Sequence, residues 1–256
     1  MRVFFVVLAR NASLVEEKTH ELNDLGFPYV VVCGERMQRS DVIFREPLGK
    51  YDAINFALNS IPSNAEVIAL NDVDTKITNL DAAFDAIKDG ASLVFVRVNV
   101  EKGPQKSFYS NLDALRKMIP IAASGELMLI RYELLKRILP LEKCKAEDSL
   151  VLFKTLQLGE RAVFCEQCYV TTVRTMLPKE EENYKRRTTA GIYQALSMSR
   201  PPPLVILFYK VLPLLSPLLL IRGKKGYYWT KGILLGYFDF VRGDKSGSWT
   251  PLGGKN

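Results

Sequence analysis

Short apolar runs alternate with helix-like segments along most of the chain, and this alternation limits the fold more than any other feature of the sequence. Strands separated by helices form a largely parallel sheet with helices on its faces. We therefore predict one α/β unit with a mixed, mostly parallel sheet. Strands are expected at 2–9, 29–33, 42–44, 67–70, 92–98, 127–130 and 162–170, and helices at 51–59, 79–87, 132–139 and 150–158.

Local signals define the beginning of the chain. Ser13, followed three residues later by Glu16, fits a capping box that opens a helix, and Gly26 is a stop signal for it. The segment 2–9 lacks a cleavage-site pattern and ends in polar Arg10, so we interpret it as a strand and not as a secretory signal. The hydrophobic content of 48% is sufficient for a full core.

The net charge of +7 is concentrated in the last part of the chain. Residues 200–256 hold nine Lys or Arg against two acidic residues, whereas residues 1–199 hold 26 basic and 26 acidic residues. A nucleic-acid-binding protein carries its basic excess on a folded face with base-reading side chains among it. Here the excess lies on an apolar tail, which favours anionic lipid headgroups and argues against a nucleic-acid partner.

The four cysteines and the sole histidine do not indicate a metal site or a catalytic site. Cys165 and Cys168 form one Cys-x-x-Cys, but no second pair or His cluster completes a four-ligand zinc site. We expect them, with Cys33 and Cys144, to be small buried hydrophobic residues. His20 lies among charged residues of the first helix, so we expect it to be solvated.

Two aspartates follow the most apolar strand. Asp72 and Asp74 come directly after Val67–Leu70, one residue apart. Such a pair can share a hard divalent cation that also binds phosphate oxygens, and ligands of open α/β sheets bind at strand ends. The alternative is an acidic turn, because Asp favours the turn that closes any strand.

Two further charged clusters come later in the chain. Glu147 and Asp148 open a helix, where acidic residues are also favoured by the helix dipole alone. Arg186 and Arg187 suit bidentate contacts with pyrophosphate. The alternative for these arginines is a solvated helix face balanced by the acidic run 180–182.

Taken together and in this order, the motifs resemble the inverting family 2 glycosyltransferases, especially the membrane-bound, cellulose-synthase-like branch. The resemblance covers about residues 1–195. It implies a single nucleotide-sugar-binding α/β domain of A type. The segments that carry it are Ala9-Arg10-Asn11, Gly49-Lys50 with Asn55, Asp72-Val73-Asp74, Gly125 to Arg131, Glu147-Asp148 and the Arg187 cluster.

The resemblance implies roles for these residues. Asp74, with Asp72 beside it, would hold Mg²⁺ or Mn²⁺ on the donor diphosphate, and Asp148 would be the base that deprotonates the acceptor. Glu126 and Glu147 would lie on the acceptor side. The implied donor-binding residues are Ala9, Arg10, Asn11, Glu35, Lys50, Asp72, Asp74 and Arg187.

The sequence departs from the family pattern at two places. The polymerising branch has Gln-x-x-Arg-Trp where this chain has Tyr184 and Thr188 around Arg187, which argues against processive polymer synthesis. The second strand ends in Cys33-Gly34-Glu35 instead of an acidic pair, so the sequence does not predict the donor base.

The tail is expected to attach the protein to a membrane. Residues 204–221 are apolar except for two, and 18 helical residues span roughly 27 Å, barely a bilayer core. Pro213 and Pro217 are expected to break or kink this run. The segment 231–242 suits a helix in the membrane interface. We therefore divide the chain into a catalytic domain, 1–199, and a membrane-associated helical tail, 200–256; the alternative is that the tail packs on the catalytic domain.

These expectations define one activity and its alternatives. We expect metal-dependent, inverting transfer of one sugar, mannose from GDP-mannose by resemblance, to a polyprenyl-linked glycan at the cytoplasmic membrane face. The alternatives are a polyprenyl-phosphate sugar synthase and a non-catalytic, membrane-binding nucleotide-sugar scaffold. A nucleotidyltransferase is disfavoured, because no Gly-rich phosphate loop follows the first strand.

Overall fold

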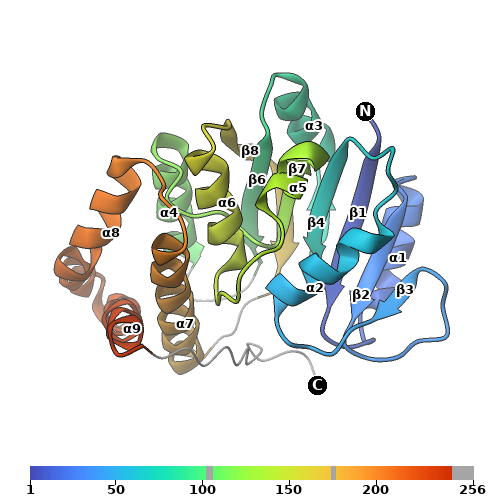
Figure 1. The fold of residues 1–256 in the computed structure, drawn as a ribbon. Coiled ribbons are helices and arrows are strands. Elements are labelled where there is room, and N and C mark those ends of the chain that lie inside the picture. The colour runs from blue at the N-terminus through green and yellow to red at the C-terminus, as the bar shows by residue number, and fades with distance from the viewer. Residues whose placement is uncertain (102–105, 174–176, 244–256) are drawn as a thin grey trace.

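The computed structural model describes residues 1–101, 106–173 and 177–243. Within these residues the chain forms one eight-stranded mixed sheet, in the order β3-β2-β1-β4-β7-β6-β8-β5, with helices on both faces (Figure 1). The strands are β1 (Val3–Ala9), β2 (Tyr29–Cys33), β3 (Val42–Phe44), β4 (Val67–Asp72), β5 (Lys76–Thr78), β6 (Leu93–Val100), β7 (Leu127–Arg131) and β8 (Ala162–Thr172). The helices are α1 (Val15–Asp24), α2 (Lys50–Ala57), η1 (Leu58–Ser60), α3 (Leu80–Lys88), α4 (Lys106–Met118), α5 (Tyr132–Ile138), α6 (Glu147–Gln157), α7 (Pro178–Ser197), α8 (Pro203–Leu215), η2 (Ser216–Arg222) and α9 (Gly223–Val241).

Strand direction brings several chain segments to one edge of the sheet. β1 pairs in parallel with β2 and β4, so the carboxyl ends of these strands meet at the same edge. β7 is antiparallel to β4, with Leu127 opposite Asn71. The residues just before β7, Gly125 and Glu126, therefore lie at the same edge as Asp72.

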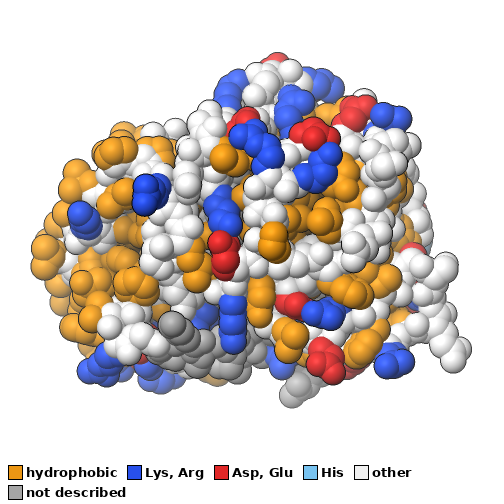
Figure 2. Space-filling view, viewed as in Figure 1, with side chains coloured by type: hydrophobic (Ala, Val, Ile, Leu, Met, Phe, Trp, Pro, Cys, Tyr) orange, Lys and Arg blue, Asp and Glu red, His pale blue; other side chains and the backbone are white. Residues whose placement is uncertain are grey.

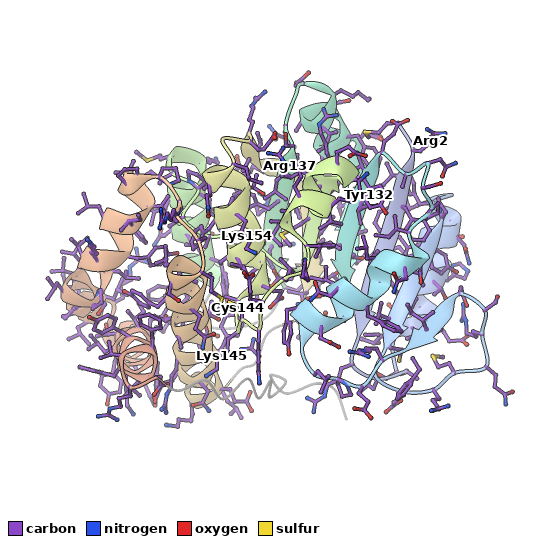
Figure 3. All side chains as sticks on the ribbon, viewed as in Figure 1. Arg2, Tyr132, Arg137, Cys144, Lys145 and Lys154 are labelled. Atoms are coloured by element: carbon purple, nitrogen blue, oxygen red, sulfur yellow. The ribbon has the colours of Figure 1, made fainter. Side chains whose placement is uncertain are left out.

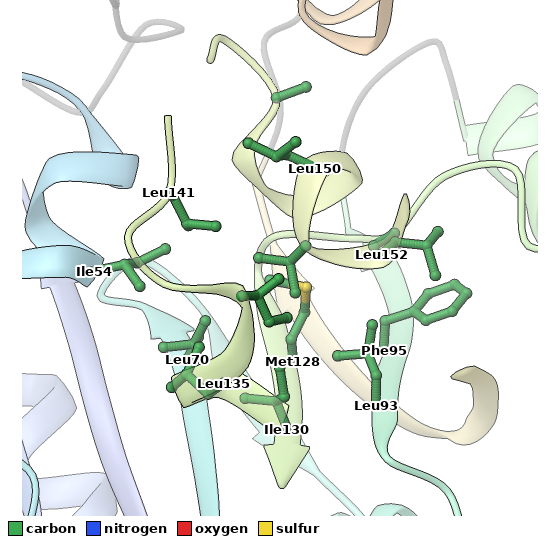
Figure 4. Close-up of a cluster of buried hydrophobic side chains, with 14 of the residues drawn as sticks. Ile54, Leu70, Leu93, Phe95, Met128, Ile130, Leu135, Leu141, Leu150 and Leu152 are labelled. Carbon is green, nitrogen blue, oxygen red and sulfur yellow. The ribbon is translucent and has the colours of Figure 1, made fainter. Parts of the chain in front are cut away.

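Apolar side chains fill both faces of the sheet. Because successive side chains of a strand point to opposite faces, Phe4 and Val6 of β1 join one core layer while Phe5 and Val7 join the other. Burial of both faces explains why the strands are nearly continuous apolar runs. Figure 4 shows part of the first layer, which includes Ile54, Leu70, Phe95, Met128, Leu135 and Leu150.

The predicted strands and helices are present, with ends shifted by a few residues, and the predicted α/β class with a mixed, mostly parallel sheet is confirmed. β5 and α4 were not predicted. The sequence also indicates a polar loop from Glu101 to Lys106; residues 102–105 of it lie outside the described part of the chain, and Lys106 begins α4. All four cysteines are free and buried, as expected.

The predicted capping box is wrong. The Ser13 hydroxyl donates to Asn11 Oδ1 at 2.7 Å, so it is not used to cap the helix. α1 instead begins at Val15, after Leu14, and its first turn has no side-chain cap. Gly26 does end this segment, with a φ of 73° that favours glycine.

The prolines divide the apolar tail as expected. α8 ends two residues after Pro213, and Pro217 lies in the 3₁₀ segment η2. Within the described residues, Pro203–Val241 is the one helical stretch that is long and apolar enough to cross a membrane by length and composition.

The first turns of the tail share a core with the α/β unit. Val205 and Tyr209 of α8 are buried in the same layer as the strands. The Tyr209 hydroxyl donates to the Ile121 carbonyl at 2.6 Å, and the Tyr193 hydroxyl donates to the Tyr209 carbonyl at 2.6 Å. The division after residue 199 stays a prediction, and it passes through a packed region of the molecule.

Candidate active site

A cleft of about 1520 Å³ opens at the edge of the sheet where β1, β2 and β4 end. The beginning of α6 and one face of α7 form further parts of its wall. Glu35 does not line it; its carboxylate accepts a hydrogen bond from the Ala12 amide at 3.0 Å and ties β2 to the loop after β1. The other predicted site residues all line the cleft: Ala9, Arg10, Asn11, Lys50, Asp72, Asp74, Glu126, Glu147, Asp148 and Arg187.

Asp72 is the last residue of β4 and lies at the centre of this edge. Its amide donates to the Glu126 carbonyl at 3.0 Å, which fixes the end of β4 beside the beginning of β7. Its side chain is 13% exposed, and Oδ2 lies 2.5 Å from Lys50 Nζ. Burial raises the pKa of Asp72 to about 6, although Lys50 acts in the opposite direction.

Lys50 is the first residue of α2 and connects two walls of the cleft. Besides Asp72, its ammonium group lies 3.9 Å from Glu147 Oε1 at the beginning of α6. Burial acts to lower the pKa of Lys50, but the carboxylates of Asp72 and Glu147 outweigh it and raise the pKa above its usual value. Lys50 therefore remains protonated.

Glu147 and Asp148 occupy the first turn of α6. Burial raises the pKa of Glu147 to about 7 and also raises the pKa of Asp148. Asp148 Oδ1 accepts a hydrogen bond from the Ser149 amide at 2.6 Å, so this carboxylate also contacts the backbone of the first turn of α6. A raised pKa makes the Asp148 carboxylate a stronger proton acceptor than an exposed aspartate.

Gly125 lets this carboxylate approach the beginning of β7. A Cβ added at Gly125 would lie 3.2 Å from both Cβ and Oδ2 of Asp148. The space beside Asp148 is therefore set by the absence of a side chain at position 125.

The sequence did not predict the buried polar contacts that support the loop 72–75, which carries Asp72 and Asp74. Lys18 of α1 is 2% exposed, and its ammonium group donates to the Thr75 carbonyl and, at 2.7 Å, to Glu21 Oε2. The Asn71 amide group donates to Thr75 Oγ1 at 2.9 Å and to the Glu126 carbonyl at 2.7 Å. Together these contacts hold the loop that presents exposed Asp74.

The position of Lys18 in the sequence indicates that its side chain is buried. It lies three residues after Val15 and four before Leu22, on the apolar face of α1, where a charged residue needs a buried partner. Burial lowers the pKa of Lys18, and Glu21 opposes this effect. The partner, Thr75, lies in a different element, so the sequence alone could not name it.

The arginine cluster is divided between two faces of α7. Arg187 lines the cleft with Tyr184 and Thr188, and its guanidinium lies 5.6 Å from the centre of the Tyr184 ring. Arg186 instead forms two hydrogen bonds with Asp239 of α9, at 2.5 and 2.7 Å. The structure thus brings Arg187, and not Arg186, to the predicted site.

α7 is fixed against the loop that precedes α6. The Lys145 amide donates to Gln194 Oε1 at 3.1 Å, and the Cys144 thiol contacts the Gly191 carbonyl at 3.4 Å. Figure 3 shows Cys144 and Lys145 on this loop, between α6 and α7. The helix that carries Arg187 is therefore positioned by the segment that leads into Glu147.

The carboxylates at the end of β4 fit a divalent cation that is shared with a phosphate ligand. Asp72 Oδ1 is buried and has no hydrogen-bond partner, so one carboxylate oxygen remains available for a ligand. Among the described residues, no group of three or more His, Cys, Asp or Glu side chains is arranged to hold a metal. A bound cation would therefore take Asp74 and Asp72 from the protein, and oxygens of the ligand and of water would complete its coordination.

Comparison with known proteins bears on the fold. No family model and no curated protein matches the sequence. Among solved structures, GalNAc-T7, crystallised with UDP, GalNAc and Mn²⁺, matches 96% of this chain and 58% of its own length, with a TM-score of 0.56 and 12% identity. The chain thus has the glycosyltransferase fold of A type and spans little more than half of that protein.

Two other solved structures match more weakly. A197 from STIV matches 66% of this chain and 84% of its own, with 13% identity and a TM-score of 0.43. Mannose-1-phosphate geranyltransferase from Thermus thermophilus matches 68% of this chain and 74% of its own, with 14% identity and a TM-score of 0.32. Neither match is strong enough to support an argument about this chain.

Proposed function

We propose that this protein is an inverting glycosyltransferase that transfers one sugar from a nucleotide sugar and depends on Mg²⁺ or Mn²⁺. One observation supports the proposal. This chain has the glycosyltransferase fold of A type, and the side chains of Asp72, Asp74, Asp148 and Arg187 line one cleft at the ends of its strands. Strand ends of open α/β sheets are the usual position of such ligands.

The residues suit the two charge changes of a glycosyl transfer. The nucleoside diphosphate leaves with concentrated negative charge, which the Arg187 guanidinium and a cation held by Asp74 would neutralise. Asp148 would accept the proton of the acceptor hydroxyl as its oxygen bonds to the anomeric carbon and the bond to the phosphate oxygen breaks. Direct displacement inverts the anomeric carbon and needs no covalent sugar intermediate.

Resemblance to membrane members of family 2 supports the more specific proposal. The donor would be GDP-mannose, and the acceptor a polyprenyl-linked glycan reached from the cytoplasmic face of the cell membrane, where the tail attaches the protein. A polyprenyl-phosphate sugar synthase is the alternative within the same enzyme class. In either case the acceptor is expected to arrive by diffusion within the bilayer.

A non-catalytic scaffold is the less favoured function. Removing carboxylates from water costs free energy, and Asp72 and Asp148 are both half-buried with raised pKa values. Perturbed carboxylates in a cleft are typical of sites that bind or react with a ligand.

A screen of nucleotide sugars by thermal shift tests the proposal. A ligand that binds only the folded protein raises its melting temperature, so the matching nucleotide sugar should do so with Mg²⁺ or Mn²⁺ and not with EDTA. The responding donor is then assayed for release of nucleoside diphosphate with short polyprenyl-linked acceptors. If no nucleotide sugar changes the melting temperature with either metal, the proposal is wrong.

A further inference from the structure

α9 is packed closely on the catalytic unit. A Cβ added at Gly232 would lie 2.6 Å from Lys185 Cβ and 2.8 Å from the Glu182 carbonyl of α7. One turn later, a Cβ at Gly236 would collide with the Arg186 carbonyl. Glycines at this spacing let the backbones of α7 and α9 approach closely. Moving α9 away from α7 would therefore break a tightly packed helix–helix contact.

Polar contacts strengthen this packing. The Trp229 indole donates to Glu181 Oε1 at 3.1 Å, and Lys231 Nζ lies 3.2 Å from Glu182 Oε1. The side chain of Glu182 is 2% exposed. Separating α9 from α7 would remove partners from buried charges, which is strongly unfavourable. α9 therefore belongs to the folded body of the protein.

Beyond its first turns, which are buried in the core, the preceding segment exposes large apolar side chains. On α8 and η2, Leu214 is 80% exposed, Leu218 63% and Ile221 87%. Figure 2 shows apolar side chains gathered over the end of the molecule where α8 lies. Exposed apolar surface of this kind in a continuous segment indicates an interaction site.

Length prevents α8 from crossing a bilayer. Its 13 residues extend about 20 Å, against a hydrocarbon core about 30 Å thick. η2 then leads into α9, which returns to α7 on the protein. Neither α8 nor α9 is thus available as a complete membrane span.

The charge of α8, η2 and the beginning of α9 indicates which kind of surface this part of the chain binds. No Asp or Glu occurs from residue 200 to residue 238. Lys210, Lys224 and Lys225 are exposed beside the apolar residues. Apolar side chains bordered by lysines complement a bilayer leaflet with anionic headgroups.

We propose that α8 and η2 enter one leaflet of an anionic bilayer and that the chain returns on the same side, with α9 still packed on α7. The proposal deepens the membrane attachment given under Proposed function and rests on it. It makes the protein monotopic. Of the two tail segments expected to contact lipid, it keeps 204–221, which forms most of α8 and η2, and assigns 231–242, mostly on α9, to the packing against α7. Residues 200 and 242 would then lie on the same side of the membrane.

Cysteine labelling of the full chain tests the topology. Arg200 and Arg242 are exposed, and the four native cysteines are buried, so Arg200→Cys and Arg242→Cys each introduce one accessible thiol. Sealed membrane vesicles of both orientations are treated with a membrane-impermeant maleimide, with detergent-treated samples as the reference for full labelling. We expect both thiols to react in the same vesicle orientation; reaction in opposite orientations would overturn the proposal.

Vesicle flotation tests the lipid contact. Wild-type protein should float with vesicles that contain phosphatidylglycerol and less with pure phosphatidylcholine, and the pair Leu218→Asp and Ile221→Asp should reduce binding at least about tenfold. The matched control is Leu48→Asp with Phe44→Asp, at residues that are 50% and 38% exposed, just after β3 and on β3, at the other end of the sheet. Equal loss in both pairs, or no flotation of the wild type, would contradict the proposal.

A thermal-shift measurement with the donor, on the same variants, tests donor binding separately from lipid binding. The Leu218 and Ile221 variants should keep the donor response of the wild type, because their residues lie outside the cleft. Lipid binding without any donor response would leave the monotopic topology intact and contradict the transferase proposal alone.

Discussion

Lys50 Nζ lies 2.5 Å from Asp72 Oδ2 and 3.9 Å from Glu147 Oε1, so one ammonium group connects the end of β4 with the beginning of α6. The two carboxylates belong to different walls of the cleft. Their shared counter-ion therefore sets how far apart these walls lie.

Replacing Lys50 should destabilise the folded protein. Lys50→Met leaves the half-buried carboxylates of Asp72 and Glu147 without a cation. Loss of this charged partner should lower the free energy of unfolding by about 1–3 kcal/mol. Urea denaturation at pH 8 measures this change. The control is Lys88→Met, which removes an exposed pair with Asp85 and should cost no more than about 1 kcal/mol. Similar effects of both variants would contradict the proposed role of Lys50.

Glu147 should give stability a defined pH dependence. Its pKa is raised from 4.5 to about 7 in the folded protein, so between these values the unfolded chain loses a proton that the folded chain keeps. Stability from this group is therefore lost as pH rises through that window. Glu147→Gln should gain stability relative to wild type more at pH 8 than at pH 5. Denaturation curves at both pH values, with exposed Glu133→Gln as control, check the sign.

Asp74→Asn should abolish metal-dependent donor binding while the fold remains intact, because Asp74 is exposed and we propose it as a direct metal ligand. Titration of the donor with and without Mn²⁺, together with circular dichroism, measures both properties. Wild-type affinity in the variant, or wild-type turnover in EDTA, would refute the role.

Asp148→Asn should leave donor affinity nearly unchanged and slow transfer by a factor on the order of 10² or more, the usual contribution of a general base. Single-turnover assays at saturating donor separate the two effects. A collapse of donor affinity with an unchanged rate at saturation would show that the role of Asp148 is misassigned.

The sequence predicted the sheet because strand and helix periodicity is local. β1 and β4 are continuous apolar runs, and their burial on both faces follows from composition alone. β5 was missed because it is three residues long and pairs with β8, which lies far away in the sequence. Its existence depends on a tertiary contact that no local pattern contains.

The sequence predicted which residues belong to the candidate site, but it did not predict which of their side chains contact each other. Asp72, Asp148 and Arg187 were selected because each lies in a charged cluster, and the structure places all three around one cleft. Their roles stay predictions. The pairing of Lys50 with Asp72 and the support by Lys18 join distant segments. The tail was interpreted from apolar length, which does not distinguish exposed Leu218 from residues of α9 that pack on α7.

The contact of Gly191 with the loop before α6 also provides a criterion for finding relatives of this chain. A Cβ at position 191 would lie 2.6 Å from the Ala146 nitrogen and 2.7 Å from the Lys145 carbonyl carbon, so any side chain there would push Arg187 and Asp148 apart. Sequences that share this arrangement should have glycine four residues after the arginine that corresponds to Arg187, together with the aspartates that correspond to Asp72 and Asp74. A search for that spaced combination can select homologues where overall identity is too low to do so.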